Sequence, residues 1–249
     1  MKPLAGRTVL ATRPADQSVE LVRRLRALGA TALVAAAIEI GPIRSATLTR
    51  ALRELSAGGF AWITLTSRAT VDVLASRLND PGDVRANVAA IGEGTGAAFR
   101  AWSRRKPDLM PATFTTTGLA RAFPRGEGRV LCARADIAPP GLEDALAAKG
   151  WSPERVDAYR TKMARSLPPG ARAALRDGQV DAITFTSAST VRGFVGAMGV
   201  VRGNPKVVAI GPVTAAEARA HGLRVSAVAR PHTIEGLLGA LEGVLSARR

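Results

Sequence analysis

Hydroxyl residues and glycines recur at four places where a short apolar run ends. Two places read Thr66-Ser67 and Thr186-Ser187, and the other two run from Gly92 to Thr95 and from Gly211 to Thr214. Such residues after a strand are typical of the first turn of a helix, where backbone N–H groups lack partners within the helix. Each helix N-terminus favours an anion by about 0.3–1 kcal/mol. The pattern predicts sites for carboxylate or phosphate groups, although ordinary helix capping would explain any one of them alone.

Two arginines and a tyrosine add to these candidates. Arg13 and Arg134 each follow an apolar run, where a guanidinium can hold a carboxylate through two hydrogen bonds. For either arginine, an ion pair with an acidic neighbour is the alternative. Tyr159 is the only tyrosine, and its phenol, with an ordinary pKa of about 10, can donate a hydrogen bond or a proton. A place at the edge of the core is the alternative for Tyr159.

Other catalytic patterns are missing from the sequence. No Gly-x-x-x-x-Gly-Lys-Ser/Thr loop is present, and the glycines from Gly92 to Gly96 lack the spacing of a dinucleotide-binding motif. One cysteine, Cys132, and two histidines, His221 and His232, are too few for a dedicated zinc site. Cys132 lies in an apolar run, so we expect a buried, inert thiol. We assign capping to His221 and a solvated turn to His232, and we expect no metal and no cofactor.

The chain is strongly basic. Lys and Arg number 35 against 20 Asp and Glu, which gives a net charge of +15, and lysine occurs at only five positions. A charge of this size attracts polyanions, but biased use of alanine and arginine explains it equally well, because no basic run occurs. Aromatic residues make up 4% of the chain, too few to stack many bases, so we expect no nucleic acid as a partner.

The remaining composition is that of a globular protein. Hydrophobic residues make up 47% of 249 residues, and a chain of this length buries about 70–75% of its unfolded surface. No apolar run reaches the roughly 18 residues of a membrane span, and no signal sequence precedes the first apolar run. We therefore expect no membrane contact and a cytoplasmic location.

The chain contains a tandem repeat of about 120 residues. Residues 63–71 match 183–191 at an offset of 120, residues 88–95 match 207–214 at 119, and residues 9–13 match 130–134 at 121. A weaker match pairs Gly118-Leu119 with Gly236-Leu237. The offsets change by about one residue at a time and in the same order, so we infer a duplicated unit.

Each repeat alternates short β-branched runs with amphipathic helical segments. The expected strands cover residues 8–11, 32–38, 62–66 and 88–91, then 130–132, 153–158, 183–186 and 207–210. A helix is expected over residues 16–28, with Val19, Val22, Leu25 and Leu28 on its buried face. Short strands alternating with helices predict parallel sheets covered on both faces. We therefore expect an α/β fold of two doubly wound domains.

Proline and glycine interrupt each repeat after its second strand. These breaks do not lie at the boundary between the repeats, which is near residue 125. We expect the chain to cross between the domains twice, with linkers at about 39–41 and 159–166. Domain 1 would then combine residues 1–38 and 167–249, and domain 2 would comprise residues 42–158. Ligands bind at the carboxyl ends of strands in such sheets, so we expect an interdomain cleft lined by the candidate residues.

The ordered motifs resemble the uroporphyrinogen-III synthase family over nearly the whole chain. The matching segments are residues 9–14, 65–67 with Val71, 91–95, 156–161, 184–188, 209–215 and 233–237. Each motif alone is loose, but the ordered set is specific. One departure is Thr117, before Gly118-Leu119, where the family often has an acidic residue.

The resemblance implies two flavodoxin-like domains joined by two strand-like linkers, and a lyase that uses no cofactor. The implied reaction belongs to haem and other tetrapyrrole biosynthesis. It converts linear hydroxymethylbilane to cyclic uroporphyrinogen III, with loss of water and inversion of ring D. The substrate carries eight carboxylates, which suits a site lined by helix N-termini and hydroxyls. A monomer is implied, with transient contact with hydroxymethylbilane synthase as the one expected protein partner.

By the same resemblance, Tyr159 matches the tyrosine that assists loss of the substrate hydroxyl. Six hydroxyl residues match positions that meet acetate and propionate groups, namely Thr66, Ser67, Thr95, Thr186, Ser187 and Thr214. Arg13, Gly92, Arg134 and Gly211 complete the expected substrate-binding set.

Three other functions are compatible with parts of the pattern. A non-catalytic relative could bind tetrapyrroles or regulate, although the presence of Tyr159 argues against this. A nucleic-acid-binding protein would use the positive charge and would bind with a steep dependence on salt. A bilobal small-anion-binding protein of the periplasmic type would need an export signal.

Overall fold

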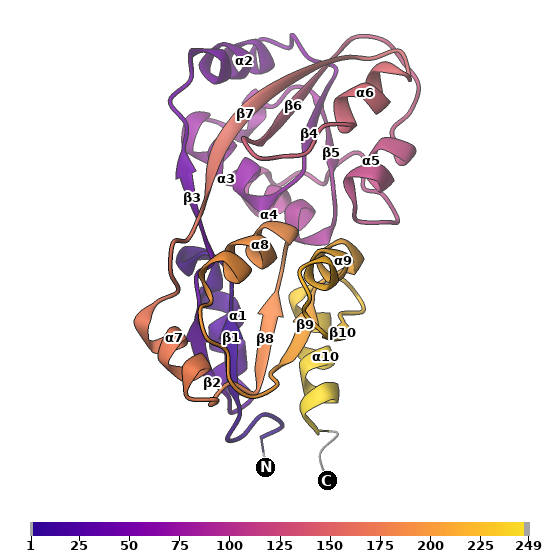
Figure 1. Cartoon of the computed structure of the whole chain (residues 1–249). Helices are drawn as coiled ribbons and strands as arrows, with labels where there is room; N and C mark the ends of the chain where they lie inside the picture. Colours follow the sequence, from indigo (N-terminus) through magenta and orange to yellow (C-terminus); the bar gives the residue numbers. More distant parts are fainter. Residues whose placement is uncertain (1, 247–249) are drawn as a thin grey trace. The chain divides into compact units, whose positions relative to one another are not determined.

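The computed structural model describes residues 2–246, and the chain divides into two compact units (Figure 1). The central unit is Ile40–Thr161, and the flanking unit combines Met1–Glu39 with Lys162–Arg249. The chain therefore passes from one unit to the other twice, at residues 39–40 and 161–162.

The flanking unit is a five-stranded parallel sheet with helices between its strands. Its strands follow the spatial order β10-β9-β8-β1-β2, and every pairing is parallel. Counted along this unit, that order is 2-1-3-4-5 reversed, which is the flavodoxin-like doubly wound order. The elements are β1 (Thr8–Ala11), α1 (Ala15–Ala27), β2 (Thr31–Val34), α7 (Pro169–Arg176), β8 (Ala182–Phe185), α8 (Ala188–Ala197), β9 (Lys206–Ala209), α9 (Pro212–Ala220), β10 (Val225–Val228) and α10 (Ile234–Ser246).

The central unit repeats this plan with two differences: strand β3 is added at the edge beside β7, and a single bridge takes the place of β10 beyond β5. Its strand order is β3-β7-β6-β4-β5, and β4, β5, β6 and β7 pair in parallel. Beyond β5, where the flanking unit has β10, Leu109 forms a single parallel bridge with Ala89. Its elements are β3 (Ile38–Pro42), α2 (Ala46–Ser56), β4 (Trp62–Leu65), α3 (Arg68–Arg77), the 3-10 helix η1 (Pro81–Asp83), β5 (Asn87–Ala90), α4 (Glu93–Ser103), α5 (Thr116–Ala122), β6 (Arg129–Ala135), α6 (Leu142–Ala147) and β7 (Ser152–Met163). The expected fold of two doubly wound α/β domains is confirmed.

Strand boundaries near the two crossings differ from those expected. The strand expected over residues 32–38 ends at Val34, and residues 39–41, expected as a linker, lie inside β3. Because β3 is an edge strand, Pro42 can end it without removing a hydrogen bond from the middle of the sheet. In the second crossing, β7 continues through Met163, so residues 159–163 are strand as well.

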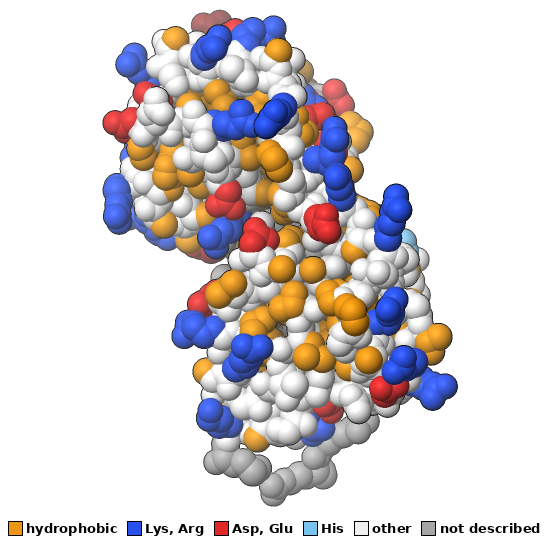
Figure 2. Space-filling view, turned by 90° about the vertical axis from the view of Figure 1, so that its left-hand side faces the viewer, with side chains coloured by type: hydrophobic (Ala, Val, Ile, Leu, Met, Phe, Trp, Pro, Cys, Tyr) orange, Lys and Arg blue, Asp and Glu red, His pale blue; other side chains and the backbone are white. Residues whose placement is uncertain are grey.

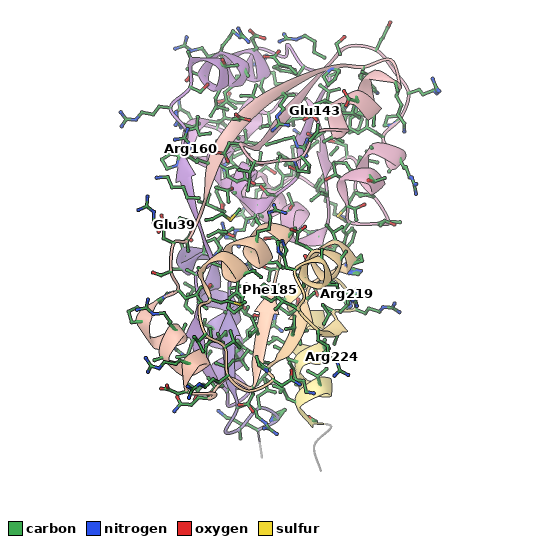
Figure 3. The ribbon with its side chains drawn as sticks, viewed as in Figure 1. Glu39, Glu143, Arg160, Phe185, Arg219 and Arg224 are labelled. Atoms are coloured by element: carbon green, nitrogen blue, oxygen red, sulfur yellow. The ribbon has the colours of Figure 1, made fainter. Side chains whose placement is uncertain are left out.

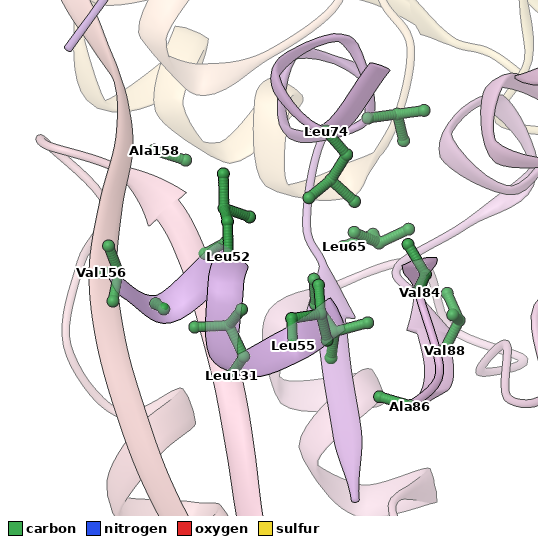
Figure 4. Close-up of a cluster of buried hydrophobic side chains, with 14 of the residues drawn as sticks. Leu52, Leu55, Leu65, Leu74, Val84, Ala86, Val88, Leu131, Val156 and Ala158 are labelled. Atoms are coloured by element: carbon green, nitrogen blue, oxygen red, sulfur yellow. The ribbon is translucent and has the colours of Figure 1, made fainter. Parts of the chain in front are cut away.

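Leucines from helices and strands form the core of the central unit. Figure 4 shows Leu52 and Leu55 of α2 and Leu74 of α3 packed near Leu65 and Leu131 of the sheet. All five are at most 5% exposed, and burial of each contributes about 1.5–3 kcal/mol.

The buried face of α1 differs from the face expected from its sequence. Ser18, Leu21, Val22 and Leu25 are its buried residues. The expectation for Val19 is wrong, because its side chain is 67% exposed. Leu21, three positions after Ser18, continues the buried face at helical spacing, whereas Val19, the residue next to Ser18, does not.

Basic side chains are spread over the face shown in Figure 2 rather than gathered in one patch. On the face shown in Figure 2, acidic side chains lie among the Lys and Arg side chains. Several arginines are paired, such as Arg7 with Asp181 at 3.0 Å and Arg192 with Glu217 at 3.1 Å. On this face, therefore, the side chains do not form a basic patch of the kind that binds polyanions. Within residues 2–246, no helix is both long enough and apolar enough to cross a membrane.

The weak match between the ends of the two repeats corresponds to two helices that begin in the same way, one in each unit. Thr115 accepts the N–H of Gly118 at 2.9 Å before α5, and Thr233 accepts the N–H of Gly236 at 3.2 Å before α10. A Cβ atom on either glycine would lie about 2 Å from the carbonyl oxygen five residues earlier, at 2.0 Å for Gly118 and 1.9 Å for Gly236. The backbone therefore leaves no space for a side chain at either position.

We predict that Gly236→Ala lowers the free energy of unfolding by about 2–3 kcal/mol, because a rigid carbonyl occupies the space of the new methyl group. Gly239→Ala, in the same helix, is the control. Its Cβ would meet nothing within 4 Å, so we expect a gain of about 0.5–1 kcal/mol from helix propensity. Urea denaturation followed by circular dichroism measures both, and equal stabilities of the two variants would contradict the packing argument.

Candidate functional site

The carboxyl ends of four adjacent strands of the central unit bring the candidate residues to one edge of its sheet. In spatial order these strands are β7, β6, β4 and β5. The chain continues from β6 to β7 on one side and from β4 to β5 on the other, so a topological switch point, the usual ligand position in such sheets, lies between β6 and β4. The candidates at this edge are Tyr159, Arg134, Thr66, Ser67, Gly92 and Thr95.

A chain of hydroxyl groups joins β7 and β6 through the start of α3, the helix that follows β4. The Tyr159 hydroxyl donates a hydrogen bond to Ser67 Oγ at 2.8 Å. Ser67 is the N-cap of α3, and its Oγ accepts the N–H of Thr70 at 3.1 Å. Thr70 Oγ1 lies 3.2 Å from Ser67 Oγ and donates to the carbonyl oxygen of Ala133 in β6, also at 3.2 Å. The structure therefore brings together Tyr159 and Ser67, which are 92 residues apart in the chain.

Burial raises the pKa of Tyr159 above its ordinary value and is the largest influence on it. The hydrogen bond with Ser67 and the charge of Arg134 act in the opposite direction, and the carboxylate of Asp136 adds to the rise. With 7% of its surface exposed, Tyr159 keeps its proton throughout the neutral range. The phenol can therefore act as a hydrogen-bond donor or as an acid.

Arg134 forms an ion pair with an acidic neighbour, which was the alternative to binding a substrate carboxylate. Its side chain is 2% exposed, and one guanidinium nitrogen lies 2.9 and 3.0 Å from the two carboxylate oxygens of Glu143, which extends from α6 (Figure 3). A buried guanidinium needs such a partner because its desolvation is costly. The structure thus favours an internal ion pair over direct contact between Arg134 and a substrate carboxylate.

The carboxyl edge of the flanking sheet is built in the same way. Ser187, the N-cap of α8, accepts the N–H of Thr190 at 3.2 Å, and its own N–H donates to Thr190 Oγ1 at 3.3 Å. Phe185, the last residue of β8 (Figure 3), is fully buried beneath this turn, whereas Thr186 and Ser187 are half-buried. Arg13 is half-buried after the neighbouring strand β1.

Gly92 and Gly211 are the N-caps of α4 and α9. A Cβ on Gly92 would lie 2.8 Å from the ring of Phe114, and one on Gly211 would lie 3.5 Å from a ring nitrogen of His232. Thr95 and Thr214, in the first turns of these helices, are only 7% and 4% exposed. Backbone N–H groups, rather than these two hydroxyls, are therefore the groups that the helix starts can offer to an anion.

Several residues near these edges had no sequence signal strong enough to identify them. At the local repeat offset of 121, Asp136 and Glu143 align with the apolar residues Ala15 and Val22. His232, expected in a solvated turn, is half-buried beside Gly211. Thr70 did stand in a repeated motif, matched by Thr190. Cys132 is buried as expected, and burial raises the pKa of its thiol to about 12. Among residues 2–246, no three His, Cys, Asp or Glu side chains gather as they would around a metal ion.

Comparisons with known proteins agree with the motifs. The family model described as uroporphyrinogen-III synthase HemD matches residues 19–239. The chain is 31% identical to uroporphyrinogen-III synthase of Synechococcus elongatus, an alignment that covers 97% of this chain and 96% of that protein. It is also 31% identical to the porphyrin biosynthesis protein HemD of Ruminiclostridium josui, where 96% of this chain spans 49% of the longer protein.

A solved structure shows the same fold. The crystal structure of a mutant uroporphyrinogen III synthase from the extremely thermophilic bacterium Thermus thermophilus aligns with a TM-score of 0.67 at 22% identity, covering 96% of this chain and 99% of that one. Together with the family model, which matches most of the residues described above, these similarities assign the chain: it belongs to the uroporphyrinogen-III synthase family.

Proposed function

We propose that this chain converts hydroxymethylbilane to uroporphyrinogen III, with loss of water and inversion of ring D. Family membership supports the reaction class. The observation that carries the proposal for this chain is the buried Tyr159 phenol, hydrogen-bonded at 2.8 Å to Ser67 at the switch point of the central sheet. This position is where a parallel α/β sheet binds its ligands.

In the proposed reaction, Tyr159 donates a proton to the hydroxyl group that leaves the ring A end of the substrate. The C–O bond breaks, water departs, and an azafulvene cation remains. The substituted carbon of ring D attacks this cation and forms a spiro intermediate, which fragments and recloses with ring D reversed. The proton released at the final step restores the phenol, so the net change is the loss of one water molecule.

The carboxyl edges of the two sheets supply the groups that would bind the substrate carboxylates. On the central sheet these are the start of α3 at Thr66-Ser67 and the start of α4 at Gly92-Thr95. On the flanking sheet they are Arg13, the start of α8 at Thr186-Ser187 and the start of α9 at Gly211-Thr214. We assign most of this binding to backbone N–H groups, since Thr95 and Thr214 are buried.

The main task of the catalyst in this reaction is to position the reacting carbons of the substrate. Free hydroxymethylbilane closes unaided to the type I isomer, so the catalyst must favour attack by the crowded substituted carbon. Holding the reacting carbons in the right orientation is a large source of rate enhancement. We assign to the Arg134–Glu143 pair an internal role, in which the charge of Arg134 offsets part of the effect of burial on Tyr159.

We also propose that the chain acts as a cytoplasmic monomer. All residues assigned to the reaction come from one chain, so a second copy is not required. Because released substrate is lost to the type I isomer, transient contact with hydroxymethylbilane synthase would be of advantage.

The proposed activity predicts a change of isomer. Hydroxymethylbilane is generated by a deaminase, the protein is added, and the products are oxidised and separated chromatographically as uroporphyrins I and III. We expect type III in proportion to the added protein, and type I alone when the protein is omitted. Type I alone in the presence of folded protein would overturn the enzyme assignment and favour a tetrapyrrole-binding or regulatory protein.

Replacing the phenol tests its role. We predict that Tyr159→Phe lowers kcat for type III formation by roughly 100-fold or more without abolishing it, because a general acid is lost while substrate folding remains. Trp151→Phe is the matched control, since it also removes a buried aromatic donor, whose bond to the Pro124 carbonyl is 2.8 Å, next to the start of β7. An unchanged kcat in Tyr159→Phe would remove Tyr159 from the mechanism, and complete loss of type III would contradict an assisting role.

A further inference from the structure

Strand β7 contains one more residue than the neighbouring strand β6 at the level of Tyr159. Arg134 pairs with Asp157, but the next residue, Ala135, pairs with Tyr159, so Ala158 is not paired with any residue of β6. An extra residue of this kind is a β-bulge, which changes the direction of the side chains that follow it.

The bulge places Tyr159 on the buried side of its strand. Along a regular strand, buried and exposed residues alternate. Val156 and Ala158 are buried and Asp157 is exposed, but Tyr159 is buried directly after Ala158, and the alternation then resumes with exposed Arg160 and buried Thr161. Without the extra residue, the side chain of Tyr159 would point to the other face of the sheet, away from Ser67.

Asp136 makes the contacts that hold this segment of β7. Its backbone N–H donates to the carbonyl oxygen of Tyr159 at 3.0 Å. Its carboxylate Oδ1 accepts the N–H of Thr161 at 2.9 Å. The same oxygen accepts the N–H of Ile137 at 3.0 Å, which fixes the carboxylate itself.

The Asp136 carboxylate accepts a hydrogen bond that a backbone carbonyl oxygen would accept if β6 continued. Thr161 lies two residues beyond Tyr159, so its N–H is the next one of β7 that points toward β6. Strand β6 ends at Ala135, immediately before Asp136, whereas β7 runs on to Met163. The side chain of Asp136 therefore supplies the last acceptor for β7 beside the tyrosine.

We propose that Asp136 is a positioning residue, whose backbone and carboxylate bracket Tyr159 in the β7 bulge and direct its phenol toward Ser67. The geometric part of this proposal concerns the structure alone, whereas its catalytic consequence rests on the function proposed above for Tyr159. Asp136 touches no reacting group and acts through the tyrosine.

The contacts of Asp136 indicate that the position of its acceptor oxygen, rather than its negative charge, holds the segment. Asp136 also faces Arg160 at 3.6 Å, but the Arg160 side chain is 59% exposed, and an ion pair so accessible to water contributes little. The short contacts are those from backbone N–H groups. Asparagine, which keeps an oxygen in the same place, should therefore replace Asp136, whereas glutamate, which keeps the charge but moves the oxygens by one methylene group, should not.

The single tyrosine allows the geometry to be tested without activity. With tyrosine labelled by carbon-13 at its hydroxyl-bearing carbon, the chain gives one tyrosine resonance, that of Tyr159. We expect Asp136→Asn to leave this resonance close to that of the unmodified chain and Asp136→Glu to shift it. Asp108→Glu is the control, because Asp108 likewise accepts a backbone N–H, that of Val88 at 2.8 Å, and faces an arginine, Arg105, at 3.4 Å. A resonance unchanged in Asp136→Glu, or shifted as much in Asp108→Glu, would overturn the proposal.

Activity then tests the consequence. We expect Asp136→Glu to lower kcat for type III formation by about as much as Tyr159→Phe, with KM within about twofold, and the double variant to be no worse than either single one. Asp136→Asn should keep most of the activity. Additive losses would overturn the catalytic part of the proposal. If Tyr159→Phe alone is fully active, the function proposed for Tyr159 fails, while the tyrosine resonance still decides whether Asp136 positions it.

Discussion

Parallel pairing of the strands is the constraint on which the other features of this protein depend. Parallel strands end at the same edge of a sheet, so a segment that joins two such strands along the chain must return to the opposite edge. Where that segment is a helix, its N-terminus lies at the edge where the strands end. The four hydroxyl and glycine turns at 66–67, 92–95, 186–187 and 211–214 are therefore gathered by topology, two on each sheet. The duplication of the unit doubled this arrangement.

Polar groups inside the sheets fix the strands that carry the site. In the flanking unit, Thr12 Oγ1 donates to the Thr184 carbonyl at 2.8 Å, and Thr184 Oγ1 donates to the Leu10 carbonyl at 2.9 Å, so two buried hydroxyls join β1 and β8 at their switch point. In the central unit, Thr70 joins α3 to β6, and Arg134 joins β6 to α6. Each of these groups is costly to bury without its partner, so each specifies one arrangement of the elements around it.

Much of the fold, but less of the site, could be predicted from the sequence. The repeat and the alternation of apolar runs with helices were sufficient for two doubly wound sheets, because both signals are local or depend on self-similarity. The residues alone did not predict strand β3, because Gly41-Pro42 is typical of a loop. The family resemblance implied strand-like linkers, and pairing with β7 at the sheet edge shows that β3 is a strand. The same limit applies to Ala158, since one extra residue in β7 is visible only when β6 lies beside it.

Contacts between distant residues explain the remaining differences. Tyr159 and Ser67 were both singled out, but their hydrogen bond depends on the order of β7, β6 and β4 in the sheet. For Arg134 the choice between substrate and internal partner depended on the placement of α6, which carries Glu143. No local pattern contains this information, whereas the helix starts, whose residues are adjacent in sequence, were located from the sequence alone.

The central claim is that anions bind at the carboxyl edges of both sheets through backbone N–H groups. Amide proton and nitrogen chemical shifts, recorded by NMR while uroporphyrinogen III is added under anaerobic conditions, test it most directly. We expect the largest changes at residues 67–70 and 92–95 of the central unit and at residues 187–190 and 211–214 of the flanking unit. Changes concentrated instead at the opposite edges, around Gly58 and Gly178 where helices α2 and α7 end, would contradict the account.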